Sequence, residues 1–197
     1  MSQTEDKLDA NAQLQIVLQE RAEEVYGASA EVKELTRLST GASRETWSFD
    51  VVYEGETTSL ILKRDPILFD DNGKIILPAD DAKHSNRITE GKLFELGRKH
   101  GVIAPEVPFF IESDDRTTQG FVSVKVEGET LGRRILRDDK FAEARAKLAH
   151  QCGFAAARIH NIPIDEMPEV YSMNVEENIE HQRGLLDSVD HPYPGFE

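Results

Sequence analysis

The sequence contains one cysteine, Cys152, and no hydrophobic run that approaches the roughly 18 residues of a membrane-spanning helix. A single cysteine excludes an internal disulfide framework and is typical of a reducing compartment. The first ten residues, MSQTEDKLDA, are polar and acidic and therefore unlike a secretory signal. We expect a soluble, globular protein of the cytoplasm that does not associate with membranes.

Positive charge is also scarce. The chain has 23 lysine and arginine residues against 37 aspartate and glutamate residues, which gives a net charge of −14. Such a surface repels nucleic-acid backbones and anionic lipid head groups at long range, so neither is an expected partner. A phosphate ligand would have to be held locally, by main-chain amides, one or two cations and a metal.

Several motifs that mark metal or phosphate sites are missing. The sequence has no CxxC, HExxH or HxH pairing, and neither a GxGxxG nor a GxxxxGK[ST] loop. Cys152 lies among apolar residues at helical spacing, which predicts a small core residue.

The first two thirds of the chain predict one helix followed by a sheet. Residues 7–26 have apolar positions near helical spacing and end before Gly27, while residues 45–53 (ETWSFDVVY) alternate strictly with the period of a half-buried strand. The segment 54–56 predicts a turn. The predicted strands are 32–39, 45–53, 57–64, 102–113 and 120–128, with a short extra strand over 74–77.

A helix from about Ala82 to His100, ending before Gly101, is predicted between the third and fourth strands. Beyond Gly128 the pattern becomes helical. We expect a long helix capped by Asp138 or Asp139 and ending near His160, and an acidic helix over 175–186. The apolar face of the long helix consists of Phe141, Leu148, Cys152, Ala155, Ala156 and Ile159.

The predicted fold class is therefore α+β, with a five-stranded antiparallel sheet and one inserted helix. We divide the chain into an N-terminal helix (1–30), a sheet lobe (31–128) and a helical segment (129–197). We found no internal repeat.

Small residues at 39–44, between the first two strands, would let main-chain amides approach a triphosphate closely. An ordinary hairpin loop explains the same composition. Residues 123–128 close the fifth strand and end in Gly128, so their backbone can meet an adenine edge. A plain edge strand running into a turn is the alternative.

Lys63 closes the third strand, and Ile61 shares its face because strand side chains alternate. An apolar residue beside an ammonium group suits a nucleotide base and its phosphates. Glu90, on the inserted helix, is a candidate partner that would hold Lys63 extended, and Glu95 is the alternative partner. Alternatively, Lys63 and Glu90 are ordinary charges, Lys63 at the end of a strand and Glu90 on the solvent-exposed side of a helix.

The order of the predicted elements resembles the N-lobe of protein-kinase-like folds. It runs strand, small-residue turn, strand, strand ending in a lysine, helix carrying a glutamate, two strands, linker and long helix. Between about Leu35 and Pro163 the sequence is similar to that of the aminoglycoside-phosphotransferase-like family. The likeness is to the branch that resembles the kinase-like portion found with some acyl-CoA dehydrogenases. The blocks that carry the likeness are GASRETWSFD, LILKRDP, APEVP, VEGETLGRRIL and AARIHNIP.

The resemblance implies a site for ATP. In it Lys63 contacts the phosphates, Glu90 pairs with Lys63, Ser123 lines the back of the pocket, and the backbone at Val124 and Val126 holds adenine. The residues that it places over the phosphates are Thr40, Gly41, Ala42, Ser43 and Arg44.

The same family uses an HxD…N loop and a later acidic motif, after the long helix, for catalysis and Mg²⁺ binding. None of the six histidines is followed by aspartate two residues on, so we name no catalytic base. We expect this chain to stop before that loop and to be inactive alone. The expected partners are therefore a missing C-terminal half or a second copy of the chain, because the uncovered apolar face of the long helix favours self-association.

Three hypotheses stay open at this point. The first is the ATP-binding portion of a Mg²⁺-dependent kinase acting on a hydroxyl group of a small molecule, of which an acyl-CoA type is one candidate. The second is a non-catalytic nucleotide-binding or regulatory module. The third is a structural α+β domain in which Lys63 and Glu90 form an ordinary surface pair.

Overall fold

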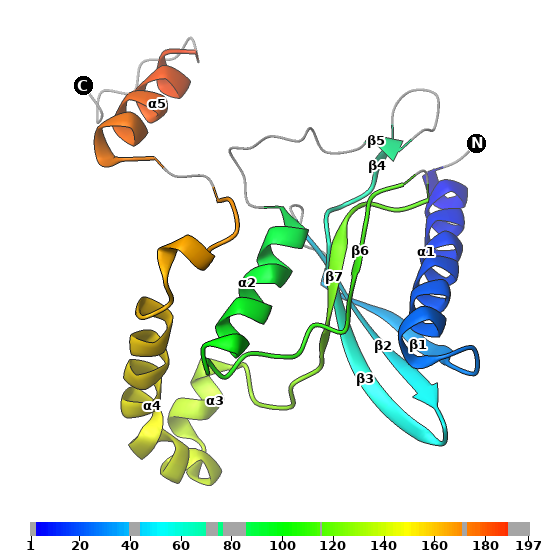
Figure 1. The fold of residues 1–197 in the computed structure, drawn as a ribbon, viewed down its shortest axis with the longest axis horizontal. Helices are drawn as coiled ribbons and strands as arrows, with labels where there is room; N and C mark the ends of the chain where they lie inside the picture. Colours follow the sequence, from blue (N-terminus) through cyan, green and yellow to red (C-terminus); the bar gives the residue numbers. More distant parts are fainter. Residues whose placement is uncertain are drawn as a thin grey trace.

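In a computed structural model, an antiparallel sheet carries one helix on each face, and further helices continue from the end of the sheet lobe (Figure 1). The structure describes residues 3–39, 44–69, 75–76, 86–114, 116–170 and 173–188. The α+β class and the five-stranded antiparallel sheet predicted from the sequence are confirmed.

The large sheet has the spatial order β1-β2-β3-β7-β6, so the last strand in sequence lies between β3 and β6. Its strands are β1 (Glu31–Ser39), β2 (Glu45–Tyr53), β3 (Glu56–Arg64), β6 (Phe109–Ile111) and β7 (Gly120–Val124). A separate pair, β4 (Leu68–Phe69) and β5 (Ile75–Ile76), lies within the segment where one short strand was predicted.

Strand β2 shows why the alternation in the sequence was informative. Trp47, Phe49 and Val51 are buried, whereas the intervening residues are half-exposed. The β2–β3 hairpin closes through Glu54 and Gly55, both with positive φ, as a two-residue turn of the primed type requires. The predicted turn is confirmed.

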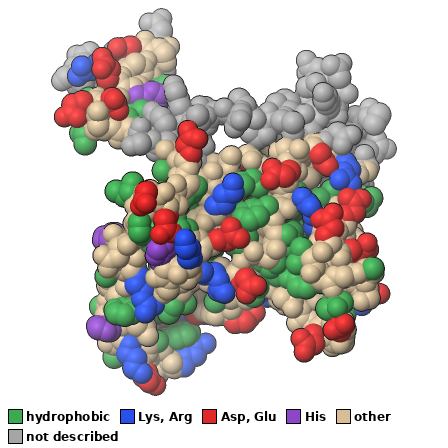
Figure 2. All heavy atoms as spheres, viewed as in Figure 1, with side chains coloured by type: hydrophobic (Ala, Val, Ile, Leu, Met, Phe, Trp, Pro, Cys, Tyr) green, Lys and Arg blue, Asp and Glu red, His purple; other side chains and the backbone are tan. Residues whose placement is uncertain are grey.

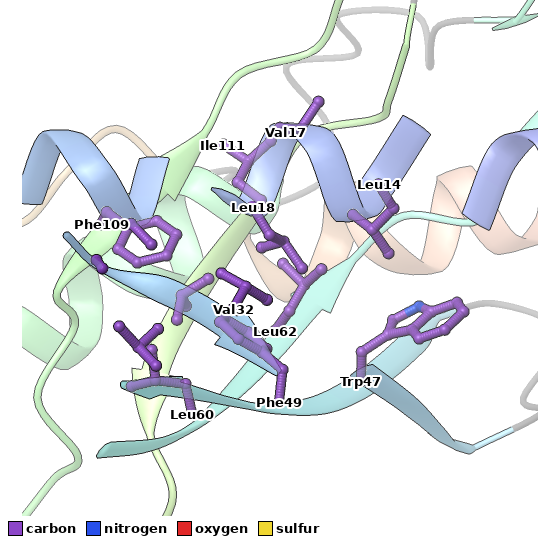
Figure 3. Close-up of a cluster of buried hydrophobic side chains, with 14 residues drawn as sticks. Leu14, Val17, Leu18, Val32, Trp47, Phe49, Leu60, Leu62, Phe109 and Ile111 are labelled. Carbon is purple, nitrogen blue, oxygen red and sulfur yellow. The ribbon is translucent and has the colours of Figure 1, made fainter. Parts of the chain in front are cut away.

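Helix α1 (Gln3–Tyr26) covers one face of the sheet and supplies its main apolar contacts. Leu14, Val17 and Leu18 lie over Phe49 and Leu62 in one buried cluster (Figure 3). Gln19 also binds β1, because its side chain accepts from the Val32 N–H at 2.9 Å and donates to the Ala30 carbonyl at 2.7 Å. The predicted N-terminal helix is thus part of the sheet lobe's core.

A buried ion pair lies at the edge of this core. Arg64, 2% exposed, donates to Glu45 Oε2 at 2.9 Å and to Thr117 Oγ1 at 3.0 Å. Glu45 also accepts from the indole N–H of Trp47 and pairs with Arg37 at 2.9 Å. Burial lowers the pKa of Arg64, while the neighbouring Glu45 raises it.

Helix α2 (Arg87–Lys99) lies on the opposite face, against β6 and β7. It begins at Arg87 and not near Ala82, because Asn86 is extended and its side chain accepts from the Thr89 N–H at 2.8 Å. Asparagine is a strong N-cap residue, so Asn86 was a signal in the sequence for the observed start of the helix. The C-terminal end before Gly101 is as predicted.

Strands β6 and β7 are shorter than the predicted 102–113 and 120–128. Pro105 and Pro108 have no N–H to donate to a ladder, and β6 begins directly after Pro108. Strand β7 ends at Val124, and the Lys125 N–H still donates to the Ser59 carbonyl of β3 at 2.9 Å.

The helical segment contains α3 (Gly132–Arg137), η1 (Asp139–Phe141), α4 (Ala142–His160), η2 (Ile164–Glu166) and α5 (Val175–Asp187). Helices α4 and α5 confirm two predictions, and α3 was missed. The predicted aspartate cap is wrong, because α4 follows η1 directly and neither Asp138 nor Phe141 makes a side-chain cap bond.

The apolar face of α4 stays uncovered in the described part of the chain. Leu148, Phe154 and Ile159 are each about half-exposed, and no residue of α4 is buried. Cys152 is exposed, so the prediction that it is a small core residue is wrong. Figure 2 shows hydrophobic side chains at the surface of this region among basic and acidic ones.

The helical segment contacts the sheet lobe through polar groups at the end of α2. Glu166 accepts from Lys99 at 2.6 Å and lies 2.9 Å from His100 Nε2, and Arg158 donates to the Gly101 carbonyl. Among the described residues, no helix has the length and hydrophobicity needed to cross a membrane.

Candidate functional site

The candidate site lies on the face of the sheet that α2 partly covers. Ile61 and Lys63 of β3 point to this face, and their register partners on β7 are Ser123 and Phe121. Leu60, Leu62 and Arg64 point the opposite way, into the core beneath α1. The alternation of β3 therefore places Leu60 and Leu62 in the apolar core and Lys63 on the opposite face.

Gly91 allows α2 to approach this face closely. A β-carbon added at Gly91 would lie 2.5 Å from Cε1 of Phe110 and 2.9 Å from Cβ of Phe121. Any larger residue would push the helix away from β6 and β7. Gly91 directly follows Glu90, so this contact sets how far that carboxylate stands from the sheet.

Lys63 of β3 and Glu90 of α2 are in contact between the sheet and the helix. Lys63 Nζ donates to Glu90 Oε1 at 3.3 Å, and their side chains are 37% and 21% exposed. The predicted pair is present, on one side of the sheet, and Glu95 is exposed and not used. A half-exposed ion pair contributes only about 0.2–1 kcal/mol to stability, so the fold does not depend on it.

Two aromatic rings border the Lys63 ammonium. Its Nζ lies 5.4 Å from the ring centroid of Phe94 and 5.7 Å from that of Phe121. The electron-rich faces of such rings attract a cation. The rings and Glu90 together border the ammonium group, while more than a third of the Lys63 side chain remains open to solvent.

Sequence reasoning missed two charged residues beside this pair. Arg87 pairs with Glu90 Oε2 within the helix, and its Nε lies 3.2 Å from Asp65 Oδ1. The Arg87–Glu90 spacing of three residues is a known helix pairing and was a usable signal. The contact with Asp65 was not readable from the sequence, because it joins a loop to a helix.

The other predicted nucleotide-binding residues differ in how the structure places them. Thr40, Gly41, Ala42 and Ser43 lie outside the described residues. Arg44 is exposed and immediately precedes β2.

Ser123 is 5% exposed and lies opposite Ile61 in the β3–β7 pairing. Val124 points its side chain toward the α1 core and donates its N–H to the Glu106 carbonyl at 2.8 Å. Val126, 69% exposed, lies beyond the end of β7. The backbone N–H of Val124 is therefore already donated within the fold.

No protein-family model matches the chain, and a search of curated proteins finds no matching relative.

Chemically, the site offers a partly exposed ammonium group with a fixed direction, an adjacent half-buried isoleucine and a small hydroxyl side chain. An ammonium group donates up to three hydrogen bonds and is a compact point charge, which suits a phosphate oxygen. Within the described ranges, no three histidine, cysteine, aspartate or glutamate side chains gather in a way that would hold a metal ion.

Proposed function

We propose that the α2-facing side of the sheet binds the phosphates of ATP, with Lys63 as the phosphate-contacting cation and Glu90 as its orienting partner. The observation that carries the proposal is the 3.3 Å contact between Lys63 Nζ and Glu90 Oε1 on a partly open face. In a chain of net charge −14, a cation aimed at a phosphate needs such a local device.

The remaining contacts are assigned within the same proposal. The segment from Thr40 through Gly41, Ala42 and Ser43 to Arg44 supplies main-chain amides to the phosphates, and Ile61 packs against the base. Because Val124 donates its N–H to Glu106, we assign the N–H donated to adenine to the backbone of Val126.

The reaction class follows from the resemblance set out above: transfer of a phosphoryl group to the hydroxyl of a small molecule, of which an acyl-CoA type is one candidate. Mg²⁺ would neutralise charge on the transferred group. Since the described residues bring together no metal-binding group, we assign the Mg²⁺ ligands and the catalytic base to other residues.

A non-catalytic nucleotide-binding module is the second candidate. The sequence observation that favours it is that none of the six histidines begins an HxD motif. Phosphate release by the pure protein would favour the kinase over this module. Nucleotide-dependent stabilisation without release fits both, so the deciding observation is an in-frame HxD…N loop encoded downstream of codon 197.

The test of nucleotide binding is thermal unfolding with increasing ATP, with and without Mg²⁺. We expect the midpoint to rise with ATP concentration, because a ligand at about 100 times its Kd stabilises by about 2.7 kcal/mol. Lys63→Ala should weaken ATP binding about ten- to a hundredfold, from the ~1.5–3 kcal/mol of a hydrogen bond to a charged group.

Lys92→Ala is the matched control, because Lys92 is an exposed lysine of α2 and its removal changes the net charge equally. Equal ATP responses in the wild type and Lys63→Ala would reject the assignment of Lys63. Equal losses in Lys63→Ala and Lys92→Ala would indicate only a general charge effect.

A further inference from the structure

Arg87 occupies an electrostatically unfavourable position. It is the first residue of α2, where the helix dipole favours anions and disfavours cations. Its side chain is nevertheless only 8% exposed. A buried guanidinium at a helix N-terminus needs carboxylates nearby to offset both its desolvation and the dipole.

Two carboxylates from different elements meet this need. Arg87 Nη1 donates to Glu90 Oε2, and Arg87 Nε lies 3.2 Å from Asp65 Oδ1. Because Lys63 binds the other oxygen of Glu90, the four side chains form a row of alternating charge: Lys63, Glu90, Arg87, Asp65. The row starts on β3 and ends directly after it, since Asp65 follows Arg64, the last residue of that strand.

Asp65 is itself held in place. Its backbone N–H donates to the Gln119 carbonyl at 3.3 Å, and its own carbonyl accepts from the Thr118 hydroxyl at 2.5 Å. The Gln119 side chain donates to Asp65 Oδ2 at 3.3 Å. These contacts fix the Asp65 carboxylate relative to β3 and β7, so it can serve as an anchor for Arg87.

We infer that Arg87, anchored by Asp65, is a positioning residue that fixes the Glu90 carboxylate and thereby aims the Lys63 ammonium at a ligand phosphate, an inference that rests on the proposed nucleotide site. A glutamate with one partner can rotate about its side-chain bonds. Glu90 has a partner on each oxygen and therefore presents Oε1 to Lys63 in one direction. Arg87 acts only through Glu90 and does not touch the ligand.

The first test compares ATP affinities of the full chain carrying Arg87→Met, Arg87→Lys or Asp65→Asn. We expect Arg87→Met to weaken ATP binding about tenfold, with partial recovery in Arg87→Lys, because a lysine ammonium binds one carboxylate but does not reproduce the fork of arginine. Asp65→Asn keeps the side-chain shape and should weaken binding several-fold. Arg98→Met, at an exposed position of the same helix, is the control and should bind as the wild type does.

The second test needs no nucleotide. In the ¹H–¹⁵N spectrum of lysine ammonium groups, recorded cold and at mildly acidic pH, the Lys63 signal should be shifted by the rings of Phe94 and Phe121. Arg87→Met and Asp65→Asn should move this signal toward that of an exposed lysine such as Lys92, and Arg87→Lys should restore part of the shift. A purely structural arginine would change the unfolding midpoint without this graded change.

The outcomes separate the two ideas. If Lys63→Ala abolishes ATP binding while Asp65→Asn and Arg87→Met alter neither affinity nor the Lys63 signal, the role of Arg87 is overturned and the nucleotide site stands. If the wild type binds no ATP, the proposed function and the ligand-directed part of this inference both fail. The ammonium spectrum then still decides whether Arg87 orients Lys63.

Discussion

Gly91 lies so close to Phe110 that a β-carbon at this glycine would come within 2.5 Å of the ring. The contact lies one residue from Glu90, on the side of α2 that faces the sheet. It links the packing of the helix to the position of the carboxylate that meets Lys63.

We therefore expect Gly91→Ala to destabilise the protein by about 1–3 kcal/mol, because overpacking outweighs the helix propensity gained from alanine. Phe121, the other ring that would be struck, is fully buried and has little room to move. Urea unfolding followed by circular dichroism measures the change.

Gly153→Ala in α4 is the control for this substitution. A β-carbon at Gly153 would meet no described atom within 4 Å, so alanine should stabilise α4 by about 0.5–1 kcal/mol. Equal effects at the two glycines would contradict the close packing of α2.

The packing of α1 on the sheet gives a second prediction. Leu18 is fully buried against the strands, so Leu18→Ala should cost about 2–5 kcal/mol. The fluorescence of Trp47, the only tryptophan and a member of the same cluster, reports unfolding. Ile16→Ala, on the exposed side of the same helix, should change stability by no more than about 0.5 kcal/mol. A small cost at Leu18 would mean that α1 is not part of the core.

The Arg64–Glu45 pair should respond unequally to loss of its two members. Glu45→Gln leaves Arg64 buried beside Thr117 without a carboxylate, and we expect a cost of about 3–5 kcal/mol. Arg64→Met should cost less, about 1.5–3 kcal/mol, because Glu45 keeps its contact with Arg37. Chemical unfolding of both variants measures the two losses of stability. A larger loss for Arg64→Met than for Glu45→Gln would show that the cluster depends more on Arg64 than on Glu45.

The contact between α2 and the helical segment should depend on pH. Hydrogen bonds from Lys99, and then from His100, lower the pKa of Glu166 below its usual 4.5. A carboxyl group whose pKa is lowered by folding stabilises the folded contact above the unfolded pKa, and this contribution is lost as pH falls through the folded pKa.

We expect the segment around Glu166 to keep its protection at neutral pH and to lose it in acid below 4.5. Amide hydrogen exchange of residues 161–170, compared across pH, measures this. Glu166→Gln should be less protected at neutral pH and should lack the acid-dependent change. A wild-type profile that is flat across the acid range would show that Glu166 does not hold the contact.

The sequence predicted the site pair better than its surroundings. Lys63 and Glu90 were readable because strand alternation places Lys63 on the face opposite the core and because a helix follows β3. Asn86 could also have been read as the helix start, since it is an N-cap residue two positions before Ile88. The contacts of Asp65 and Phe121 with α2 could not be read in this way, because no local pattern marks Asp65 as a partner of the helix or places Phe121 beneath Gly91. Both contacts depend on how α2 packs on the sheet.

Local patterns by themselves determined the α+β class, the presence of five strands, the C-terminal end of α1 and the bounds of α5 to within one residue, because apolar periodicity and turn residues act within a few residues of one another. Tertiary structure alone decided that β7 inserts between β3 and β6, that Cys152 is exposed, and that Arg87 is buried between two carboxylates. Those outcomes depend on which elements pack together. A helix or strand carries in its own sequence the face that it will bury, but not the partner that will cover that face.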